Sequence, residues 1–145
     1  MSTILVATDG SSSAQAAVAA ALELAQETRD DVCFVTVWRE FHGDFGLPYA
    51  KLLAPDLADI ERDWALETLA AAAAEAERAG IPADTVARHG KPAHEICAVA
   101  KERAARMIVV GSSGWGLIEG LLLGSVSSEV LRHARRPVLV VPRPE

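Results

Sequence analysis

Four short apolar runs separated by helix-forming segments constrain the fold of this chain more than any other feature. The runs are rich in valine and isoleucine and cover residues 3–8, 31–38, 106–111 and 137–142. Their apolarity is continuous rather than alternating, which is typical of parallel strands that are covered by helices on both faces. A weaker run at 84–89 alternates, so we expect it to be a strand near an edge of the sheet.

The segments between these runs carry the signals of helices. Residues 11–28 open with serines that can cap a helix, and residues 56–79 open with carboxylates and stop before Gly80. Two further helices are expected at 92–104 and 125–134. Strict alternation of strands and helices predicts an α/β protein with a Rossmann-like open five-stranded parallel sheet and helices on both faces.

Length and charge limit the class of protein. With 145 residues, the chain fits a single domain covering residues 1–145. A formal net charge of -6 argues against a general nucleic-acid binder, because the phosphate backbone favours clustered lysine and arginine. The first residues lack a basic leader and no apolar stretch is long enough to span a bilayer, so we expect a cytoplasmic protein with no membrane partner.

A few residues with potential chemistry have simpler interpretations. The basic residues of 132–136 lie where a helix is expected to end, and we interpret them as partners of the negative end of its dipole. Cys33 and Cys97 have neither CxxC spacing nor a cluster of histidines beside them, and we expect both to be small buried residues. The segment 40–55 has no clear period and is either a flap over the ligand site or a long surface connection.

The ligand site of an open parallel sheet lies outside the carboxyl ends of its strands, where the winding direction reverses. This rule selects the loop after the first strand, TDGSSS, and the loop after the fourth, GSSGWG. The glycine spacing of the second loop matches neither a P-loop nor a dinucleotide fingerprint, which would follow the first strand. NTP chemistry of the Walker type and NAD or FAD binding are therefore disfavoured.

A different spacing connects Gly111, Gly114 and Gly124, and Ser125 follows the last of them. Gly111 ends a buried strand, Gly114 allows the chain to turn, and Gly124 with Ser125 stands at the start of the next helix. Unpaired N–H groups at a helix N-terminus, with the helix dipole behind them, form an anion site. Gly116 and Gly120 are expected only to shape the loop between.

With this spacing the chain resembles the universal stress protein family, in particular the branch with an ATP-binding G-x2-G-x9-G-(S/T) motif. The resemblance covers nearly the whole length, through ILVATDGSSSA, GKPAHEICAVAKERAARMIVVGSSGWG and LLLGSVSSEVLRHARRPVLVV. We expect Mg²⁺, held weakly through Asp9, to accompany a bound nucleotide. The resemblance implies an ATP, ADP or AMP cofactor and a role as a nucleotide-dependent regulatory or adaptor module in the stress response. It also implies a strand order of 3-2-1-4-5.

The nucleotide-binding residues that the resemblance implies come from three parts of the chain. They are Ala7, Thr8 and Asp9 after the first strand, Val37 late in the second, and Val110, Gly111, Gly114, Gly124, Ser125, Val126 and Ser127 around the glycine motif. Two departures stand out. Trp115 replaces a basic residue that many relatives have, and Arg106 replaces an acidic residue at the far end of the fourth strand, which we interpret as a change outside the site.

The residues offer no general base for catalysis, so efficient ATP turnover is not expected. Two alternatives remain open: an adenylate-handling enzyme or slow ATPase, and a nucleotide-free dimeric scaffold. The last strand carries Val138, Leu139, Val140 and Val141 between two prolines and is expected at a sheet edge. An exposed apolar edge favours pairing with a second chain, and the resemblance also implies a homodimer through this strand.

Overall fold

The computed structural model describes residues 2–39, 57–113 and 123–144. Nine elements alternate along this part of the chain. They are β1 (Thr3–Ala7), α1 (Ser12–Thr28), β2 (Asp31–Trp38), α3 (Leu57–Arg78), β3 (Ala83–His89), α4 (Pro92–Glu102), β4 (Met107–Gly111), α5 (Ser125–His133) and β5 (Val138–Val141). The predicted strands and helices are all present, with ends that differ by two residues or fewer.

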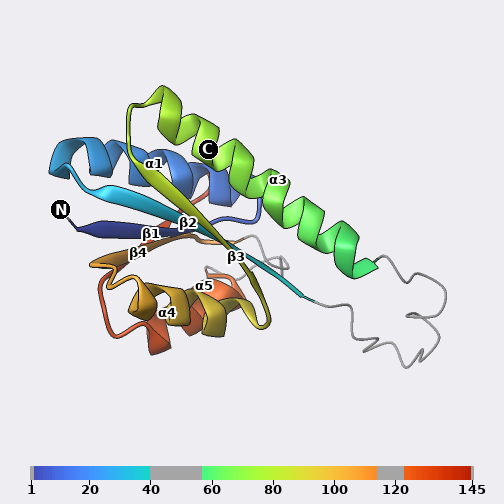
Figure 1. The fold of residues 1–145 in the computed structure, drawn as a ribbon. Coiled ribbons are helices and arrows are strands. Elements are labelled where there is room, and N and C mark those ends of the chain that lie inside the picture. The colour runs from blue at the N-terminus through green and yellow to red at the C-terminus, as the bar shows by residue number, and fades with distance from the viewer. Residues whose placement is uncertain (1, 40–56, 114–122, 145) are drawn as a thin grey trace.

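The five strands form one parallel sheet in the order β3-β2-β1-β4-β5. Helices α1 and α3 cover one face, and α4 and α5 cover the other (Figure 1). The predicted α/β Rossmann-like fold and its strand order are thus confirmed. The weak alternating run became β3, an edge strand whose side chains are partly or fully exposed, which explains its weaker apolar signal.

Each face of the sheet has its own apolar core. Ile4, Val6 and Phe34 pack against α1 and α3, while their neighbours Leu5 and Val35 pack under α4 and α5. Because successive side chains of a strand point to opposite faces, a strand buried on both sides must be apolar at every position. This requirement explains the continuous apolar runs.

Alanine brings the helices close to the sheet. Ala17 and Ala21 of α1, and Ala72 and Ala76 of α3, have almost no exposed surface. Helix α3 ends where Gly80 adopts φ +72°, with Ile81 N–H donating to Ala76 O at 2.9 Å. The predicted stop of this helix at Gly80 is a left-handed turn that glycine adopts without strain.

Arg106 lies at the amino edge of the sheet, away from the glycine motif. Its Nε donates to Asp30 Oδ2 at 2.6 Å, and the Thr28 hydroxyl donates to the same oxygen at 2.7 Å. Burial alone would raise the pKa of Asp30, but the hydrogen bonds from Thr28 and Arg106 and the charge of Arg106 outweigh it and lower the pKa below 3.8. The interpretation of Arg106 as a fold-level change agrees with this ion pair.

Candidate functional site

The carboxyl end of β4 meets the N-terminus of α5. Val110, Gly111, Ser113 and the first turn of α5 line one small cavity of about 10 Å³, which has room for roughly one water-sized group. Strand β4 lies next to β1 at the centre of the sheet. The chain runs from β1 to β2 on one side and from β4 to β5 on the other, so the cavity lies at the point where the winding direction reverses.

Gly111 allows α1 to approach the end of β4. A Cβ atom at Gly111 would lie 2.4 Å from the hydroxyl oxygen of Ser13 and 2.8 Å from its carbonyl carbon and oxygen. Ser13 is buried, and its hydroxyl accepts a hydrogen bond from Ser113 N–H at 3.2 Å. The first turn of α1 thus holds the chain that leaves β4, and only glycine fits between them.

Gly124 serves as the N-cap residue of α5 without a side chain. Its N–H donates to Ser112 O at 2.6 Å, so this group is used to hold the helix against the end of β4. The Ser127 hydroxyl donates to Gly124 O at 3.0 Å and is buried. No side chain among the described residues caps the helix, and the first-turn N–H groups of Ser125 and Val126 are among those that an α-helix leaves without intrahelical acceptors.

These first-turn amides, which we call the α5 amide site, are suited to bind an anion. The positive end of the helix dipole stands behind them, equivalent to about half an elementary charge. We had expected the N–H of Gly124 to be free for a ligand, but it is bound to Ser112, so the open donors begin one residue later. Ser125 is exposed, which leaves its hydroxyl accessible.

The turn after β1 lies against β2 and opens α1. Thr8 N–H donates to Val35 O at 3.0 Å, and the Thr36 hydroxyl donates to Thr8 O at 2.8 Å. Asp9 Oδ1 accepts from Ser11 N–H at 2.9 Å, so one carboxylate oxygen stabilises the turn. Asp9 is partly exposed. Its second oxygen makes no hydrogen bond or ion pair with the residues that the structure describes.

The apolar members of the expected site are buried. Ala7, Val37 and Val110 belong to the core beneath α4 and α5, and each is at most 2% exposed. A ligand at the carboxyl edge would therefore meet their backbone atoms before their side chains. Val126 is also buried, and it lies in the first turn of α5. Gly114, Trp115, Gly116, Gly120 and the segment 40–55 lie outside the described residues.

Arg143 is a further candidate site residue, which no sequence motif indicates. Its Nε donates to the Ser113 hydroxyl at 3.0 Å, and Ser113 lines the small cavity. The register explains this contact, because β5 is parallel to β4 and Val141 pairs with Gly111, so the residues after β5 reach the same edge. Its position just beyond the last strand was the available signal in the sequence.

Two further expectations concern the surface. Strand β5 is an edge strand, and Val138, Val140 and Val141 are partly exposed while Leu139 is 37% exposed. Cys33 is buried as expected, but Cys97 is only partly buried. The expectation for Cys97 was wrong because its neighbours across α4 and α5 include small alanines, which leave a groove above the thiol.

Metal binding and membrane insertion are two further properties that the described residues bear on. Among residues 2–39, 57–113 and 123–144, no three histidine, cysteine, aspartate or glutamate side chains are grouped so as to hold a metal ion. In this part of the chain, none of the helices combines the length and apolarity that crossing a membrane requires.

Comparison with known proteins identifies relatives over the whole fold. Residues 1–142 match the model of the universal stress protein family. The chain is 34% identical to the universal stress protein YxiE of Bacillus subtilis, over 95% of this chain and 97% of that protein. A universal stress family protein from Burkholderia pseudomallei superposes with a TM-score of 0.78 at 32% identity, covering 97% and 96% of the two chains.

A third match has a ligand named in its description. It is the crystal structure of a universal stress protein in complex with cAMP, which is 28% identical and has a TM-score of 0.70. The match covers 99% of this chain and 98% of that one.

Proposed function

The chain belongs to the universal stress protein family, and we propose that it is a regulatory or adaptor module that binds an adenine nucleotide at the carboxyl edge of its sheet. The observation that carries this proposal is the α5 amide site. Its amides have no side-chain cap, its N-cap glycine is bound to the end of β4, and both lie at the reversal point of the sheet.

The site residues suit phosphate groups better than other ligands. Backbone amides and hydroxyls at a helix N-terminus favour negative charge, and the close Gly111–Ser13 packing keeps side chains out of the region. Arg143 adds a cation beside Ser113. The relative solved with cAMP supports an adenine nucleotide as the phosphate-bearing ligand. ATP with Mg²⁺ is the form that we propose, with ADP and AMP as alternatives.

Mg²⁺ would reach the protein mainly through the nucleotide. One carboxylate oxygen of Asp9 already accepts a hydrogen bond from Ser11 N–H, so the other oxygen is suited to contact a metal-bound water. The same geometry argues against a dedicated general base at Asp9. We therefore propose binding and signalling rather than efficient hydrolysis.

Isothermal titration calorimetry with ATP, ADP, AMP and cAMP tests the proposal. We expect saturable binding that is lost in Gly124→Val, because a Cβ at Gly124 already meets Ser112 O at 3.2 Å and larger branches displace α5. Gly80→Ala, a glycine substitution at the opposite edge, is the control and should keep wild-type affinity. Absence of binding to the wild-type protein at millimolar nucleotide and Mg²⁺ would contradict the proposal.

A turnover assay separates the adaptor from an adenylate-handling enzyme. We expect ATP to remain bound and largely intact over many minutes. Rapid release of AMP or pyrophosphate would instead assign the protein to the enzyme class.

We also propose that the module is a homodimer joined through β5. The edge position of this strand and its partly exposed valines support pairing with a second copy. A dimer would contain two nucleotide sites. Nucleotide binding could then change how the two subunits associate.

A further inference from the structure

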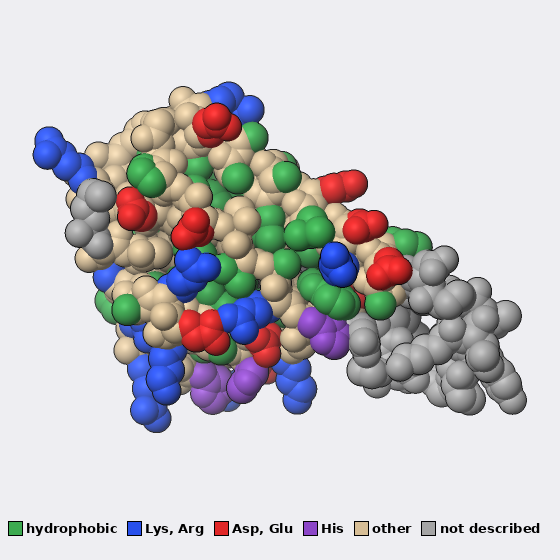
Figure 2. All heavy atoms as spheres, viewed as in Figure 1, with side chains coloured by type: hydrophobic (Ala, Val, Ile, Leu, Met, Phe, Trp, Pro, Cys, Tyr) green, Lys and Arg blue, Asp and Glu red, His purple; other side chains and the backbone are tan. Residues whose placement is uncertain are grey.

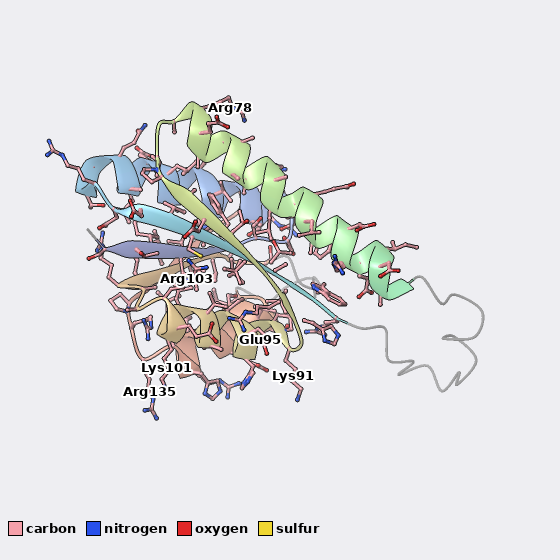
Figure 3. All side chains as sticks on the ribbon, viewed as in Figure 1. Arg78, Lys91, Glu95, Lys101, Arg103 and Arg135 are labelled. Atoms are coloured by element: carbon pink, nitrogen blue, oxygen red, sulfur yellow. The ribbon has the colours of Figure 1, made fainter. Side chains whose placement is uncertain are left out.

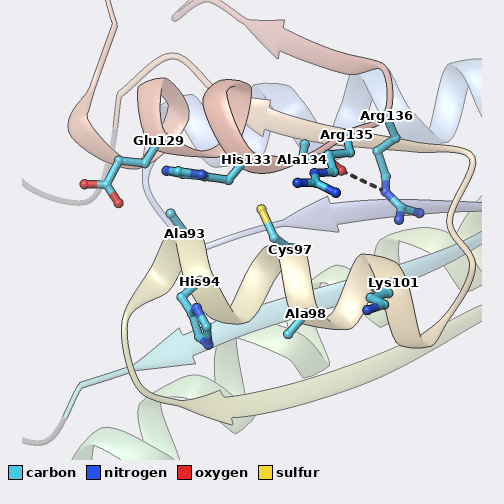
Figure 4. A pocket seen from close by; sticks show the side chains of 10 residues that line it. All are labelled: Ala93, His94, Cys97, Ala98, Lys101, Glu129, His133, Ala134, Arg135 and Arg136. Carbon is cyan, nitrogen blue, oxygen red and sulfur yellow. Dashed lines mark hydrogen bonds between the residues drawn. The ribbon is translucent and has the colours of Figure 1, made fainter.

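A second and larger cavity lies between α4 and α5. It has a volume of about 510 Å³ and shares none of its lining residues with the cavity at the α5 amide site. We call it the α4–α5 groove. Its floor consists of small side chains, Ala93 and Cys97 from α4 and Ala134 after α5 (Figure 4). The cavity at the α5 amide site touches only the first turn of α5, whereas the groove begins at Glu129 and continues to the residues that follow the helix. A molecule bound at the amide site therefore does not account for the groove.

Basic residues gather at one end of the groove. Lys101 of α4 lies across from Arg135 and Arg136, which follow α5, while Glu129 lies at the other end (Figure 4). The lining thus carries three cationic side chains and one carboxylate, a balance of +2 with histidines neutral. Two helix C-termini offset about one unit of this charge, at about half a unit each. A positive excess remains on a protein whose formal net charge is -6.

The three cations differ in whether their side chains already form hydrogen bonds within the protein. Arg136 donates to three backbone carbonyls, Ala134 O at 3.2 Å, Ala100 O at 3.0 Å and Ala105 O at 2.5 Å. It is therefore a structural residue that closes the end of α4. The side chains of Lys101 and Arg135 make no ion pair or hydrogen bond with the residues that the structure describes.

Lys101 and Arg135 also share one side of the molecule. Both project from the α4 and α5 layer, whereas Arg78 projects from the far end of α3 in the other layer (Figure 3). In the space-filling view, histidine side chains accompany basic side chains along the edge of the α4 layer, and acidic side chains are spread along α3 (Figure 2). Acidic side chains are not confined to α3, because α4 also carries Glu95 and Glu102.

The floor of the groove is apolar and does not oppose an anion. Burial raises the pKa of the Cys97 thiol, which keeps it uncharged at neutral pH, and the charge of Arg136 only partly offsets this effect. Ala93 and Ala134 are almost fully buried beneath it. A volume of about 510 Å³ lies within the range of sites that hold small organic molecules.

From this arrangement we infer that the α4–α5 groove is a second ligand site, which binds a small amphipathic organic anion. The acidic group of the ligand pairs with Lys101 and Arg135, and its apolar body covers Cys97 and the alanine floor. The site is independent of the proposed nucleotide site, and its test needs no nucleotide.

Cys97 provides a direct reporter of occupancy. The chain has two cysteines, and Cys33 is 1% exposed, so alkylation of the folded protein by iodoacetamide occurs first at Cys97. The probes are naphthaleneacetate, which carries a carboxylate on an apolar body, and its neutral isostere naphthaleneacetamide. The rate of Cys97 alkylation, followed by peptide mass spectrometry, should fall about tenfold at about ten times the dissociation constant of naphthaleneacetate. The neutral amide should protect much less.

Variants of the cationic end separate charge pairing from simple contact. The double variant Lys101→Ala and Arg135→Ala should bind naphthaleneacetate about fivefold more weakly, as expected for the loss of two ion pairs that involve exposed cations. Arg78→Ala removes a cation from the other layer and should leave protection unchanged. Ala98→Phe, which fills the groove beside Cys97, should abolish protection by the ligand, with circular dichroism used to verify that each variant is folded.

Three results with the probes and variants would overturn the inference. They are unchanged alkylation in saturating naphthaleneacetate, equal protection by the acid and its amide, and equal loss of protection in the double variant and in Arg78→Ala. Protection that rises with protein concentration in the absence of any probe would also overturn it, because a second copy of the chain would then cover the groove.

Discussion

At the scale of the residue, Gly111 shows why composition alone does not identify a functional glycine. Gly111 has ordinary strand geometry, so its backbone angles do not require glycine. Glycine is required at this position because Ser13 approaches so closely. Gly111→Ala should destabilise the protein by about 1–3 kcal/mol, because overpacking against buried backbone outweighs the small gain from replacing glycine. Urea unfolding measures this, and a variant as stable as the wild type would contradict the close packing of α1 on β4.

Arg143 is the residue through which charge at the proposed site is most easily tested. Arg143→Ala should weaken ATP binding about fivefold at low salt, since an exposed ion pair contributes on the order of 1 kcal/mol, and the difference should shrink as salt rises. Adenosine, which has no phosphate, should bind both proteins equally. Arg132→Ala removes an exposed cation at the other end of α5 and serves as the control. Equal ATP affinity of the Arg143 variant and the wild type at low salt would remove Arg143 from the site.

The Arg106–Asp30 pair links one residue to stability in acid. The pKa of Asp30 is lowered in the folded protein, so its contribution to stability is present above its unfolded value of about 3.8 and is lost as pH falls through the lower folded value. Arg106→Ala should cost about 2 kcal/mol near neutral pH, the scale of a hydrogen bond to a charged group.

The same variant should also change the shape of the pH dependence. Burial is the largest single influence on Asp30, and without the hydrogen bond and charge of Arg106 less remains to offset it. The pKa of Asp30 therefore rises, and the loss of stability on acidification begins at a higher pH. Urea unfolding across the acid range measures both effects. If the two proteins differed by a constant free energy at every pH, the ion pair would not be the cause.

At the scale of the element, the left-handed turn after α3 offers a substitution whose effect on stability should have a single cause. Gly80 has φ +72°, and no atom lies within 4 Å of the position that its Cβ would occupy. Gly80→Ala should therefore cost about 1–2 kcal/mol, the energy of placing an L-residue in this conformation, with no packing contribution. Chemical unfolding measures the cost, and Gly80→Asn should recover part of it because asparagine tolerates the left-handed region. An alanine variant of unchanged stability would show that the helix ends differently.

The elements were predictable because their signals are local. Continuous apolar runs marked the strands, and serine, proline and glycine marked the helix ends to within two residues. The α5 amide site was predictable in outline from the glycine spacing. The use of Gly124 N–H by Ser112 was not, because this hydrogen bond depends on how two elements meet and not on either sequence segment alone.

At the scale of the whole molecule, the sheet order decides which distant residues meet. Placing β5 beside β4 brings Arg143 to Ser113 across 30 positions of sequence. The same packing leaves a groove between α4 and α5. No sequence motif indicates this groove, because it exists where alanines leave space between the two helices. Small residues give a weak sequence signal, so neither the groove nor the partial exposure of Cys97 could be predicted from the sequence.

The proposed dimer is the last consequence of the sheet order. Within the part of the chain that the structure describes, β5 pairs with β4 and with no other strand, so its outer edge carries backbone donors and acceptors suited to a second strand. Leu139→Lys places a charge on this edge at a position that is 37% exposed in the single chain. A dimer would bury this charge at an apolar interface, so the variant should be monomeric at concentrations where the wild type is dimeric.

Light scattering coupled to size-exclusion chromatography measures the mass of each species. Leu131→Lys, which changes a leucine of α5 that is 44% exposed, controls for the general effect of adding a charge and should remain dimeric. A wild-type protein that stays monomeric at high micromolar concentration would refute pairing through β5. If both lysine variants dissociated equally, the interface would extend over α5 and the edge of β5 would not be its centre.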